Sequence, residues 1–220
     1  MRGIPHRWDL SPGEAVALQK KLAAQVNTNT PIDLSALELV AGVDVSVKDN
    51  VSRAAIVVMT FPGLEEVESS TAQMPTPFPY ISGLLSFREG AVILEAHARL
   101  RHTPGAYLFD GQGIAHPRRI GIASHVGLWL DAPTVGCAKT RLTGHHHEPG
   151  REKGSYVPLM GEGGEVIGVV LHTRTGIKPV YVSVGHRATL ETARALVMRC
   201  TSRYRLPEPI RAAHRVAGAF

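Results

Sequence analysis

A short, wholly apolar segment, Ala106 to Phe109, ends directly at an acidic residue, Asp110. Four consecutive apolar residues that stop at an Asp-Gly pair are typical of a strand buried inside a sheet. Open α/β sheets place their ligand sites just beyond the carboxyl ends of such strands, and Asp110 has this position. The segment therefore predicts an α/β fold with a functional carboxylate at a sheet edge. The alternative is a strand that ends in an ordinary Asp-Gly turn, with no function.

The residues after Asp110 combine an accessible backbone with positive charge. Gly111 and Gly113 have no Cβ, so a ligand can approach the main chain closely at both positions. Positions 116 to 119 then bring a histidine, a proline and two arginines. An acid that could hold a metal, beside basic groups that could hold phosphates, favours chemistry on a phosphodiester.

The rest of the sequence predicts a mixed sheet flanked by helices. Val43, Val45 and Val47 alternate with polar residues, which is the period of a strand with one apolar face. Two more strands, at 54–61 and 66–73, would complete an antiparallel meander. Capping residues and apolar periodicity predict helices over 11–26, 87–101, 120–130, 189–203 and 209–217, and further strands over 133–138, 166–171 and 180–184.

Length and composition fit one globular domain that spans residues 1–220. The chain has 24 Lys and Arg against 19 Asp and Glu, a formal charge of +5, which favours a polyanionic partner without requiring one. Its two cysteines, Cys137 and Cys200, match no disulfide framework or metal motif, which suits a reducing compartment. The sequence also has no apolar run of membrane-spanning length. We therefore expect a cytoplasmic, monomeric protein that does not bind membranes.

Two further acids occupy positions that need an explanation. Asp44 lies within the strand of alternating valines, where Asp is uncommon, so it marks either an exposed edge or a functional site. Glu89 closes the sequence Ser86-Phe87-Arg88-Glu89, which has the pattern of a helix capping box. A purely structural role is therefore open to Glu89.

A lysine and a histidine are the remaining candidates for chemistry. Lys139 follows the strand at 133–138 as Asp110 follows its own strand, although most lysines are simply solvated. His214 shares a helix face with Ile210 and Ala217, which predicts a side chain directed toward the protein. A lone inward histidine is more often a core residue than a catalytic one, so His214 matters only in company with the acids. Three consecutive histidines at 145–147 cannot all face one way, and we predict no metal site there.

The segment Pro79-Tyr80-Ile81-Ser82-Gly83 places an aromatic and an aliphatic side chain together in a turn-rich loop. Neither belongs to a periodic core face, and exposed apolar tips usually have a partner. The alternative makes Tyr80 an ordinary packed residue of a proline-rich loop.

Taken together, these residues resemble those of the endonuclease V family, also called deoxyinosine 3′ endonucleases. The resemblance covers most of the chain, and its motifs follow one another in the family's order. The matching motifs are Ala41-Gly42-Val43-Asp44, Pro79-Tyr80-Ile81 with Phe87-Arg88-Glu89, Asp110-Gly111-Gln112-Gly113 with His116-Pro117-Arg118 and Gly121-Ile122-Ala123-Ser124-His125, Ala138-Lys139, Gly185-His186 and Pro207-Glu208-Pro209.

The resemblance implies an RNase H-like α/β fold and a DNA repair enzyme that depends on Mg²⁺, with Mn²⁺ as a substitute. It also implies hydrolysis of the second phosphodiester bond 3′ of a deoxyinosine, leaving a 3′-hydroxyl and a 5′-phosphate. For such a reaction we assign Asp44 and Asp110 as direct metal ligands and Glu89 as a third acidic contributor. His214 is a candidate to position or deprotonate water, and Lys139 to stabilise the charge of the transition state.

Recognition of the lesion would fall to a different set of residues. Hypoxanthine lacks the amino group of guanine, so a pocket lined by the backbone of Gly83, Gly111 and Gly113 could exclude the larger base. Tyr80, with Ile81 beside it, would fill the gap left in the stack when the base turns out. The residues expected to hold the strand and the lesion are His116, Arg118 and Arg119.

One position departs from the family pattern, and two other functions compete with the one it implies. The family's loop usually reads Pro-Tyr-Ile-Pro, whereas this chain has Ser82 at the last position, which frees φ and predicts a less rigid loop. The first competing function is an endoribonuclease that acts on inosine in RNA. The second is a nucleic-acid-binding protein without catalysis, which three acids near phosphates make less favourable.

Overall fold

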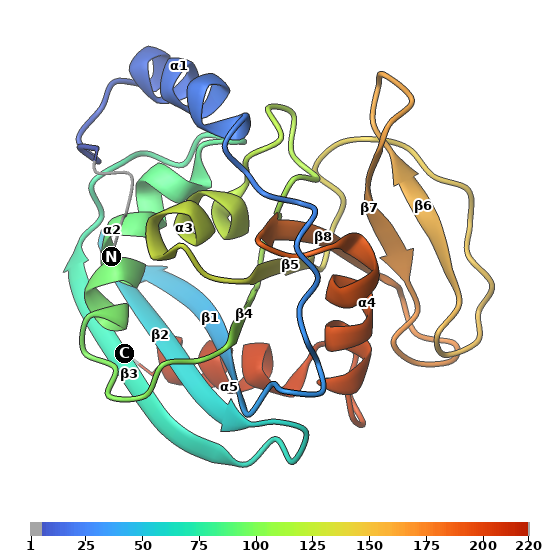
Figure 1. Ribbon diagram of the computed structural model, residues 1–220. Coiled ribbons are helices and arrows are strands. Elements are labelled where there is room, and N and C mark those ends of the chain that lie inside the picture. The colour runs from blue at the N-terminus through green and yellow to red at the C-terminus, as the bar shows by residue number, and fades with distance from the viewer. Residues whose placement is uncertain (1–5, 220) are drawn as a thin grey trace.

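One eight-stranded sheet of mixed direction runs through the computed structural model, which describes residues 6–219. Figure 1 shows this sheet with helices on both of its faces. The strand order is β3-β2-β1-β4-β5-β8-β7-β6. The strands are β1 (Leu39–Lys48), β2 (Val51–Thr60), β3 (Glu66–Pro75), β4 (Ala106–Phe109), β5 (Thr134–Ala138), β6 (Tyr156–Met160), β7 (Val166–Leu171) and β8 (Val180–His186). The helices are α1 (Pro12–Ala23), α2 (Leu85–His97), α3 (Ile122–Leu130), α4 (Leu190–Arg199) and α5 (Glu208–Ala217).

Strands β1, β2 and β3 form the predicted antiparallel meander, and β1 then pairs in parallel with β4. Strand β4 has the predicted bounds and is buried along its whole length. Its side chains alternate between two cores, with Leu108 in one and Phe109 in the other. A strand with both faces covered has no place for a polar residue, which explains its unbroken apolar sequence. Burying side chains such as these contributes roughly 1.5–3 kcal/mol each.

The two cores lie on opposite faces of the sheet and belong to different helices. Helices α2 and α3 contribute Val92, Ile93 and Val126 to the core that contains Phe109. Helices α4 and α5 contribute Leu196 and Ile210 to the core that contains Leu108. This layered arrangement confirms the predicted α/β fold with a mixed sheet flanked by helices (Figure 1).

Helix α5 packs very closely against β1, and a glycine allows this contact. A Cβ built on Gly42 would lie 2.0 Å from the carbonyl atoms of Pro209, so any larger residue would push the helix away. From Pro209 to His214 the helix rises about 7.5 Å. From Gly42 to Asp44 the strand advances about 6.6 Å. Because these two distances are similar, the close contact at Gly42 places His214 beside Asp44.

Helix starts were predicted better than helix ends. Ser11 and Thr189 cap α1 and α4 as expected, each in a capping box. Both helices and α2 nevertheless end before the predicted residues 26, 203 and 101. Val26 and Leu100 continue the apolar spacing but pack against the cores from loops. The apolar periodicity therefore extends beyond the last helical residue and overestimates the length of the helix.

The predicted capping box at Ser86 is wrong. Helix α2 starts earlier, with Leu84 in the N-cap position, so Ser86 lies inside the helix. The buried Ser86 hydroxyl instead lies 2.8 Å from Nδ1 of His125. A tertiary partner has thus replaced the local one that the sequence pattern suggested.

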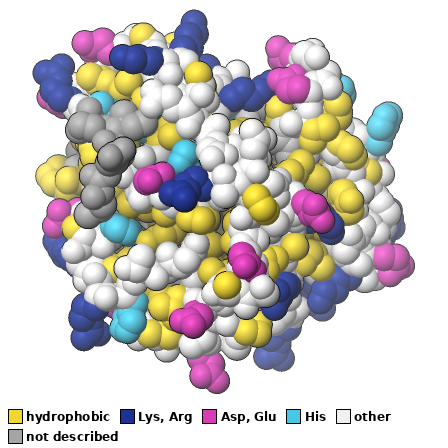
Figure 2. Space-filling view, viewed as in Figure 1, with side chains coloured by type: hydrophobic (Ala, Val, Ile, Leu, Met, Phe, Trp, Pro, Cys, Tyr) yellow, Lys and Arg dark blue, Asp and Glu magenta, His cyan; other side chains and the backbone are white. Residues whose placement is uncertain are grey.

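Strand β6 was not predicted. It contains Pro158, and proline is disfavoured in strands except at sheet edges. Strand β6 lies at the edge of the sheet, where it pairs with β7 and Met160 also forms a bridge with His145. Over the part of the chain that is described, no helix has the length and apolar character needed to span a membrane. Figure 2 shows one face of the molecule, on which basic and acidic side chains are interspersed with apolar ones.

Candidate functional site

Two acids meet where β1 passes the end of β4. The strands are parallel with Val43 opposite Phe109, so the next residue of each, Asp44 and Asp110, lies beside the other. The Asp110 N–H donates to the Val43 carbonyl at 3.1 Å, which extends the pairing by one residue. Both carboxylates are largely enclosed, with 12% of each side chain exposed. The structure thus brings together the two acids that were predicted as metal ligands.

His214 reaches this pair from helix α5. Its Nδ1 lies 2.6 Å from Oδ2 of Asp44, across 170 positions of sequence. A carboxylate can only accept, so Nδ1 carries a proton, and in the neutral ring Nε2 is left as a free acceptor. The expectation that His214 points toward the protein needs a correction. Its ring contacts Asp44 but 64% of the side chain is exposed, because it lies at the rim of the site and not in the core.

Among residues 6–219, Asp44, Asp110 and His214 form a group whose potential ligand atoms all lie within 4.8 Å of one another. Carboxylate oxygens are the ligands that Mg²⁺ prefers, usually one or two of them together with water and substrate oxygens. Two enclosed carboxylates that lie side by side also repel each other unless a cation lies between them. The donor set therefore fits a divalent metal ion.

The electrostatics of the acids agree with this interpretation. Burial, and then the charge of Asp110, raise the pKa of Asp44, although the hydrogen bond from His214 opposes the shift. Burial raises the pKa of Glu89 to about 8, and the charges of Asp44 and Asp110 add to the effect. Acidic groups are thus concentrated in a poorly solvated corner of the protein, where a divalent cation would favour their ionised forms.

Glu89 projects from α2 and does not cap it. The N-cap of α2 receives no side-chain hydrogen bond, and no described residue forms a hydrogen bond or an ion pair with the Glu89 carboxylate. The charges of Asp44 and Asp110 both raise the pKa of Glu89, so its carboxyl group lies within electrostatic range of the two acids. Glu89 is not one of the three closest groups. The structural alternative offered by the sequence is therefore wrong, and a role for Glu89 at the metal stays a prediction.

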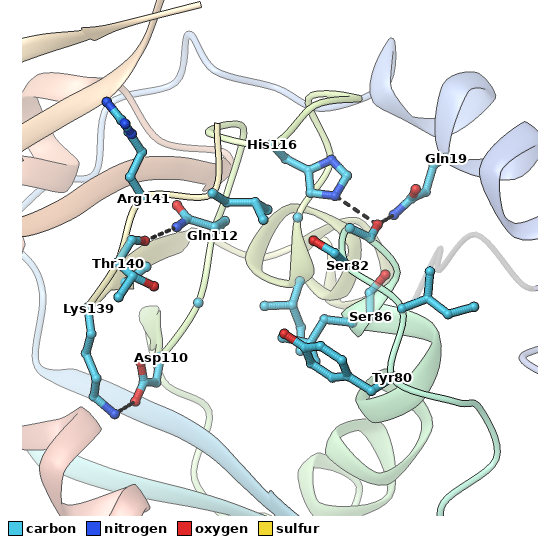
Figure 3. Close-up of a pocket in the computed structure, with 18 residues that line it drawn as sticks. Gln19, Tyr80, Ser82, Ser86, Asp110, Gln112, His116, Lys139, Thr140 and Arg141 are labelled. Carbon is cyan, nitrogen blue, oxygen red and sulfur yellow. Dashed lines mark hydrogen bonds and ion pairs between the residues drawn. The ribbon is translucent and has the colours of Figure 1, made fainter. Parts of the chain in front are cut away.

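Lys139 follows β5 and joins the site through Asp110. Its Nζ donates to Oδ2 of Asp110 at 2.5 Å, as Figure 3 shows. The guanidinium of Arg205 donates to the Lys139 carbonyl at 2.6 Å and so fixes the backbone behind the ammonium group. Lys139 is thus an exposed lysine, with 42% of its side chain accessible, whose ammonium group is paired with a candidate metal ligand.

A cavity of about 260 Å³ opens beside the acids (Figure 3). In Figure 3, Asp110, Lys139, Thr140 and Gln112 line one side, and Tyr80, Ser82 and Ser86 line the other. This volume is slightly below the usual range of ligand pockets, which begins at about 300 Å³, and it is large enough for a purine ring system. The other lining residues are Gln19, Ile81, Gly83, Leu85, Gly111, His116, Gly121, Ile122, Ala138, Arg141 and Leu142.

The predicted lesion-binding residues divide into two groups. Tyr80, Ile81, Gly83 and Gly111 line the cavity, and Tyr80 leaves 76% of its surface exposed. Ile81 also packs against the small core under the loop, whereas Tyr80 is largely exposed. Gly113 does not line the cavity. It lies buried behind the cavity, where a Cβ would come within 1.9 Å of the Val184 carbonyl oxygen.

Three donors meet at the carbonyl oxygen of Gly83 and restrain the tyrosine loop. Gln19 donates from α1 at 3.0 Å, His116 at 2.9 Å and the Arg118 guanidinium at 2.8 Å. Gly83 itself has φ +79°, which glycine adopts without strain. Burial lowers the pKa of His116 to about 4, so the ring is neutral, and its Nδ1 accepts from the Arg118 N–H. We name these donors, Gln19, His116 and Arg118, the Gly83 clamp.

The clamp changes the interpretation of the basic residues at 116–119. Arg118 also donates from Nε to Oε1 of Gln19, and Arg119 forms an ion pair with Glu165. Both guanidinium groups therefore have protein partners. Arg118 supports the loop through Nε and Nη2, and its contact with the strand stays a prediction. The clamp also restrains the residue next to Ser82, which supplies part of the rigidity that a proline would add.

Sequence patterns missed several residues of the cavity. Gln19 lies on α1 among residues that only indicate a helix, and Ser86 was assigned to a cap. Gln112 donates to the Thr140 carbonyl at 2.9 Å, while its buried Oε1 has no partner among the described residues. Of these three residues, only Gln112 had a local sequence feature that could have indicated a role in the cavity, because it lies between Gly111 and Gly113.

Comparison with known proteins gives a consistent result. The family model described as Endonuclease V matches residues 20–215. A protein named Endonuclease V from Nostoc punctiforme is 49% identical over 216 residues, which cover 97% of this chain and 97% of that protein.

Solved structures agree in fold and in coverage. The crystal structure of the endonuclease V from Streptomyces avermitilis superimposes with a TM-score of 0.91 at 41% identity and covers 97% of this chain and 94% of its own. The endonuclease V of Ciona intestinalis, crystallised with a 24-nucleotide DNA containing an inosine followed by a ribo-adenosine, gives a TM-score of 0.79 at 28% identity. That comparison covers 93% of this chain and 95% of that chain. The RNase H-like fold implied by the sequence resemblance is thereby confirmed.

Proposed function

Because the chain belongs to the endonuclease V family, we propose that it is a DNA repair endonuclease that cleaves a strand containing deoxyinosine at the second bond 3′ of the lesion. The observation that carries this proposal is one arrangement. Three potential metal ligands lie within 4.8 Å of one another at the edge of a cavity of about 260 Å³, which is large enough to admit a base. A base in the cavity would bring its own strand across the acids.

Mg²⁺ is the metal that the donor set favours, with Mn²⁺ as a substitute, held by Asp44 and Asp110 with Glu89 close by. When bound, the ion would supply charge neutralisation for the phosphate and for the leaving 3′ oxygen. Lys139, already held at Asp110, would place a second positive charge at the same phosphate. The protein thus concentrates cations where negative charge develops.

His214 has the features of a group that orients or deprotonates water. Asp44 holds its Nδ1 proton, which fixes the tautomer and leaves Nε2 free to accept a proton from the attacking water. The exposed ring has access to solvent, the source of that water. Asp44 thus serves two purposes, because it holds the metal and orients the histidine.

Recognition of the base rests on the cavity and the tyrosine loop. Gly83 and Gly111 expose backbone to the base, so the exclusion of an additional amino group would depend on how closely these backbone atoms approach the base. Tyr80 projects into solvent at the mouth of the cavity, where it can replace the extruded base in the stack. All of these residues come from one chain, so we propose that a monomer acts, with residues 1–220 as a single catalytic domain.

Three variants test the metal assignment, with cleavage of a single-stranded DNA containing one deoxyinosine as the assay. Asp44→Asn and Asp110→Asn keep the shape of each side chain but remove a ligand charge, so cleavage in Mg²⁺ should fall at least a hundredfold with little change in melting temperature. Glu95→Gln, at an exposed ion pair with Arg99 that does not line the cavity, is the matched control. Near-normal cleavage by either Asp variant would refute the assignment.

The same assay separates the competing functions. A strand with one riboinosine, offered beside its deoxyribose counterpart, measures the preference between RNA and DNA. Faster turnover of the RNA strand would favour the endoribonuclease. Tight binding with no cleavage of either strand, in Mg²⁺ or Mn²⁺, would leave only the binding protein.

A further inference from the structure

A second cavity of about 360 Å³ adjoins the candidate metal site. Its lining residues are Lys139, Tyr204, Arg205, Leu206, Arg211, His214 and Arg215. Lys139 belongs to both cavities, whereas Asp110 lines only the first and His214 only the second. Because Asp110 and His214 belong to the same group of potential ligands, that group lies between the two cavities.

The second cavity has a strongly positive lining. Four of its seven lining residues are Lys or Arg, and none is Asp or Glu. The nearby acid Glu208 is already paired with Arg211 at 2.6 Å. A concave surface with this charge attracts polyanions and raises their local concentration.

An aromatic platform lies within this basic surface. Tyr204 keeps 44% of its surface exposed. The Arg211 guanidinium covers one face of its ring at 3.4 Å from the ring centroid, and the Arg203 guanidinium lies 5.8 Å from the same centroid. Glu208 holds Arg211 in place and is itself held by Ser202. A tyrosine fixed in this way loses little conformational freedom when a ligand packs against it, and aromatic rings of this kind stack on nucleobases of any sequence.

Two arginines beside the platform have different roles. Arg205 donates to the carbonyls of Lys139 and Pro179, both at 2.6 Å, and so joins the wall of the cavity to the metal site. Arg215 is exposed on α5, one residue after His214, and has no hydrogen bond or ion pair with any described residue. Arg215 is therefore free to bind a phosphate.

The order of the two cavities defines a path for one strand. If the lesion base occupies the first cavity and the cleaved phosphate lies at the acids, the strand continues into the second cavity. We propose that this second cavity binds the first nucleotides on the 3′ side of the cleaved bond, with Tyr204 against a base or sugar and Arg215 on a phosphate. This site rests on the proposed function, since cleavage 3′ of the lesion sets the direction of the strand.

The test varies the length of the strand beyond the cut. Deoxyinosine oligonucleotides share one 5′ part and extend one, two, four or eight nucleotides past the cleaved bond. For the wild type, KM should fall as the extension grows to fill the second cavity and then level off. Tyr204→Ala and Arg215→Gln should each raise KM roughly 5- to 30-fold on the longest substrate, in line with the loss of one stacked base or one phosphate contact. On the shortest substrate KM should barely change.

Two controls separate binding from folding. Tyr156 is a comparable exposed tyrosine, and the Arg194 guanidinium lies over its ring at 4.4 Å from the ring centroid. Both residues line a cavity that shares no residue with the proposed site, so Tyr156→Ala and Arg194→Ala are the controls. Both should keep the wild-type dependence on length. Tyr204→Phe keeps the ring and should restore most of the affinity. Arg215→Gln should also reduce the slope of log KM against log salt by about 0.7, as expected for the loss of one contact to a single strand.

The outcomes distinguish this site from the function on which it rests. If Tyr204→Ala and Arg215→Gln change KM equally at every length, or at none, the second cavity is not a strand-binding site although the enzyme cleaves as proposed. If the wild type cleaves no deoxyinosine strand of any length, the proposed function fails and the site fails with it.

Discussion

Replacing Tyr80 with alanine separates recognition from chemistry. Because 76% of Tyr80 is exposed, only about a quarter of its surface is buried. Full burial of a large side chain is worth roughly 1.5–3 kcal/mol, so truncation should cost less than about 1 kcal/mol of stability. For a chain of this size that corresponds to a fall in melting temperature of less than about 4 °C.

The expected loss in function is larger and depends on the substrate. A ring that fills the vacated position in the stack should contribute roughly 1–3 kcal/mol, by analogy with base stacking on aromatic side chains. Tyr80→Ala should therefore weaken binding to a duplex with deoxyinosine by roughly 5- to 150-fold. On a single strand no partner stack needs repair, so the loss should be much smaller.

The assay is single-turnover cleavage of the duplex and of the matching single strand across a range of enzyme concentrations, beside a melting curve. Tyr156→Ala is the control, because that tyrosine is also exposed, at 48%, but lies away from the cavity. Equal losses on duplex and single strand would refute the proposal that Tyr80 fills the vacated position in the stack. A large fall in melting temperature would instead identify Tyr80 as an ordinary packed residue.

The remaining predictions concern the buried acid and the Gly83 clamp. Because the pKa of Glu89 is raised from 4.5 to about 8, its ionisation destabilises the metal-free fold. The melting temperature in EDTA should therefore fall as pH rises from about 5 to 8, and Glu89→Gln should flatten that fall; an unchanged slope would contradict a buried acid. Gln19→Ala removes one donor from the Gly83 carbonyl, and the freed loop should lower duplex cleavage roughly 3- to 10-fold through weaker preorganisation, with metal affinity unchanged. If the variant has the metal affinity and the cleavage rate of the wild type, His116 and Arg118 are sufficient to restrain the loop without Gln19.

Local chemistry made much of this protein predictable from its sequence. The bounds of β4 follow from four apolar residues before an Asp-Gly pair, and the starts of α1 and α4 follow from the capping residues Ser11 and Thr189. Such signals depend on a residue and its near neighbours, so they hold before any packing is known. The candidate residues Asp44 and Asp110 were found in the same way, because an acid in or after a buried strand is conspicuous.

Only the tertiary structure decided how these elements combine into a site. The contact between His214 and Asp44 spans 170 positions and depends on the close packing of α5 against Gly42. In the Gly83 clamp, residues 33 to 64 positions away from Gly83 donate to its carbonyl oxygen, and Arg118 thereby supports the loop, which its sequence position did not indicate. Ser86, which looked like a cap, took a distant partner instead. The sequence by itself determined which residues could carry the chemistry, whereas register and packing between distant segments decided which of them meet, since no local pattern records the geometry of a long-range contact.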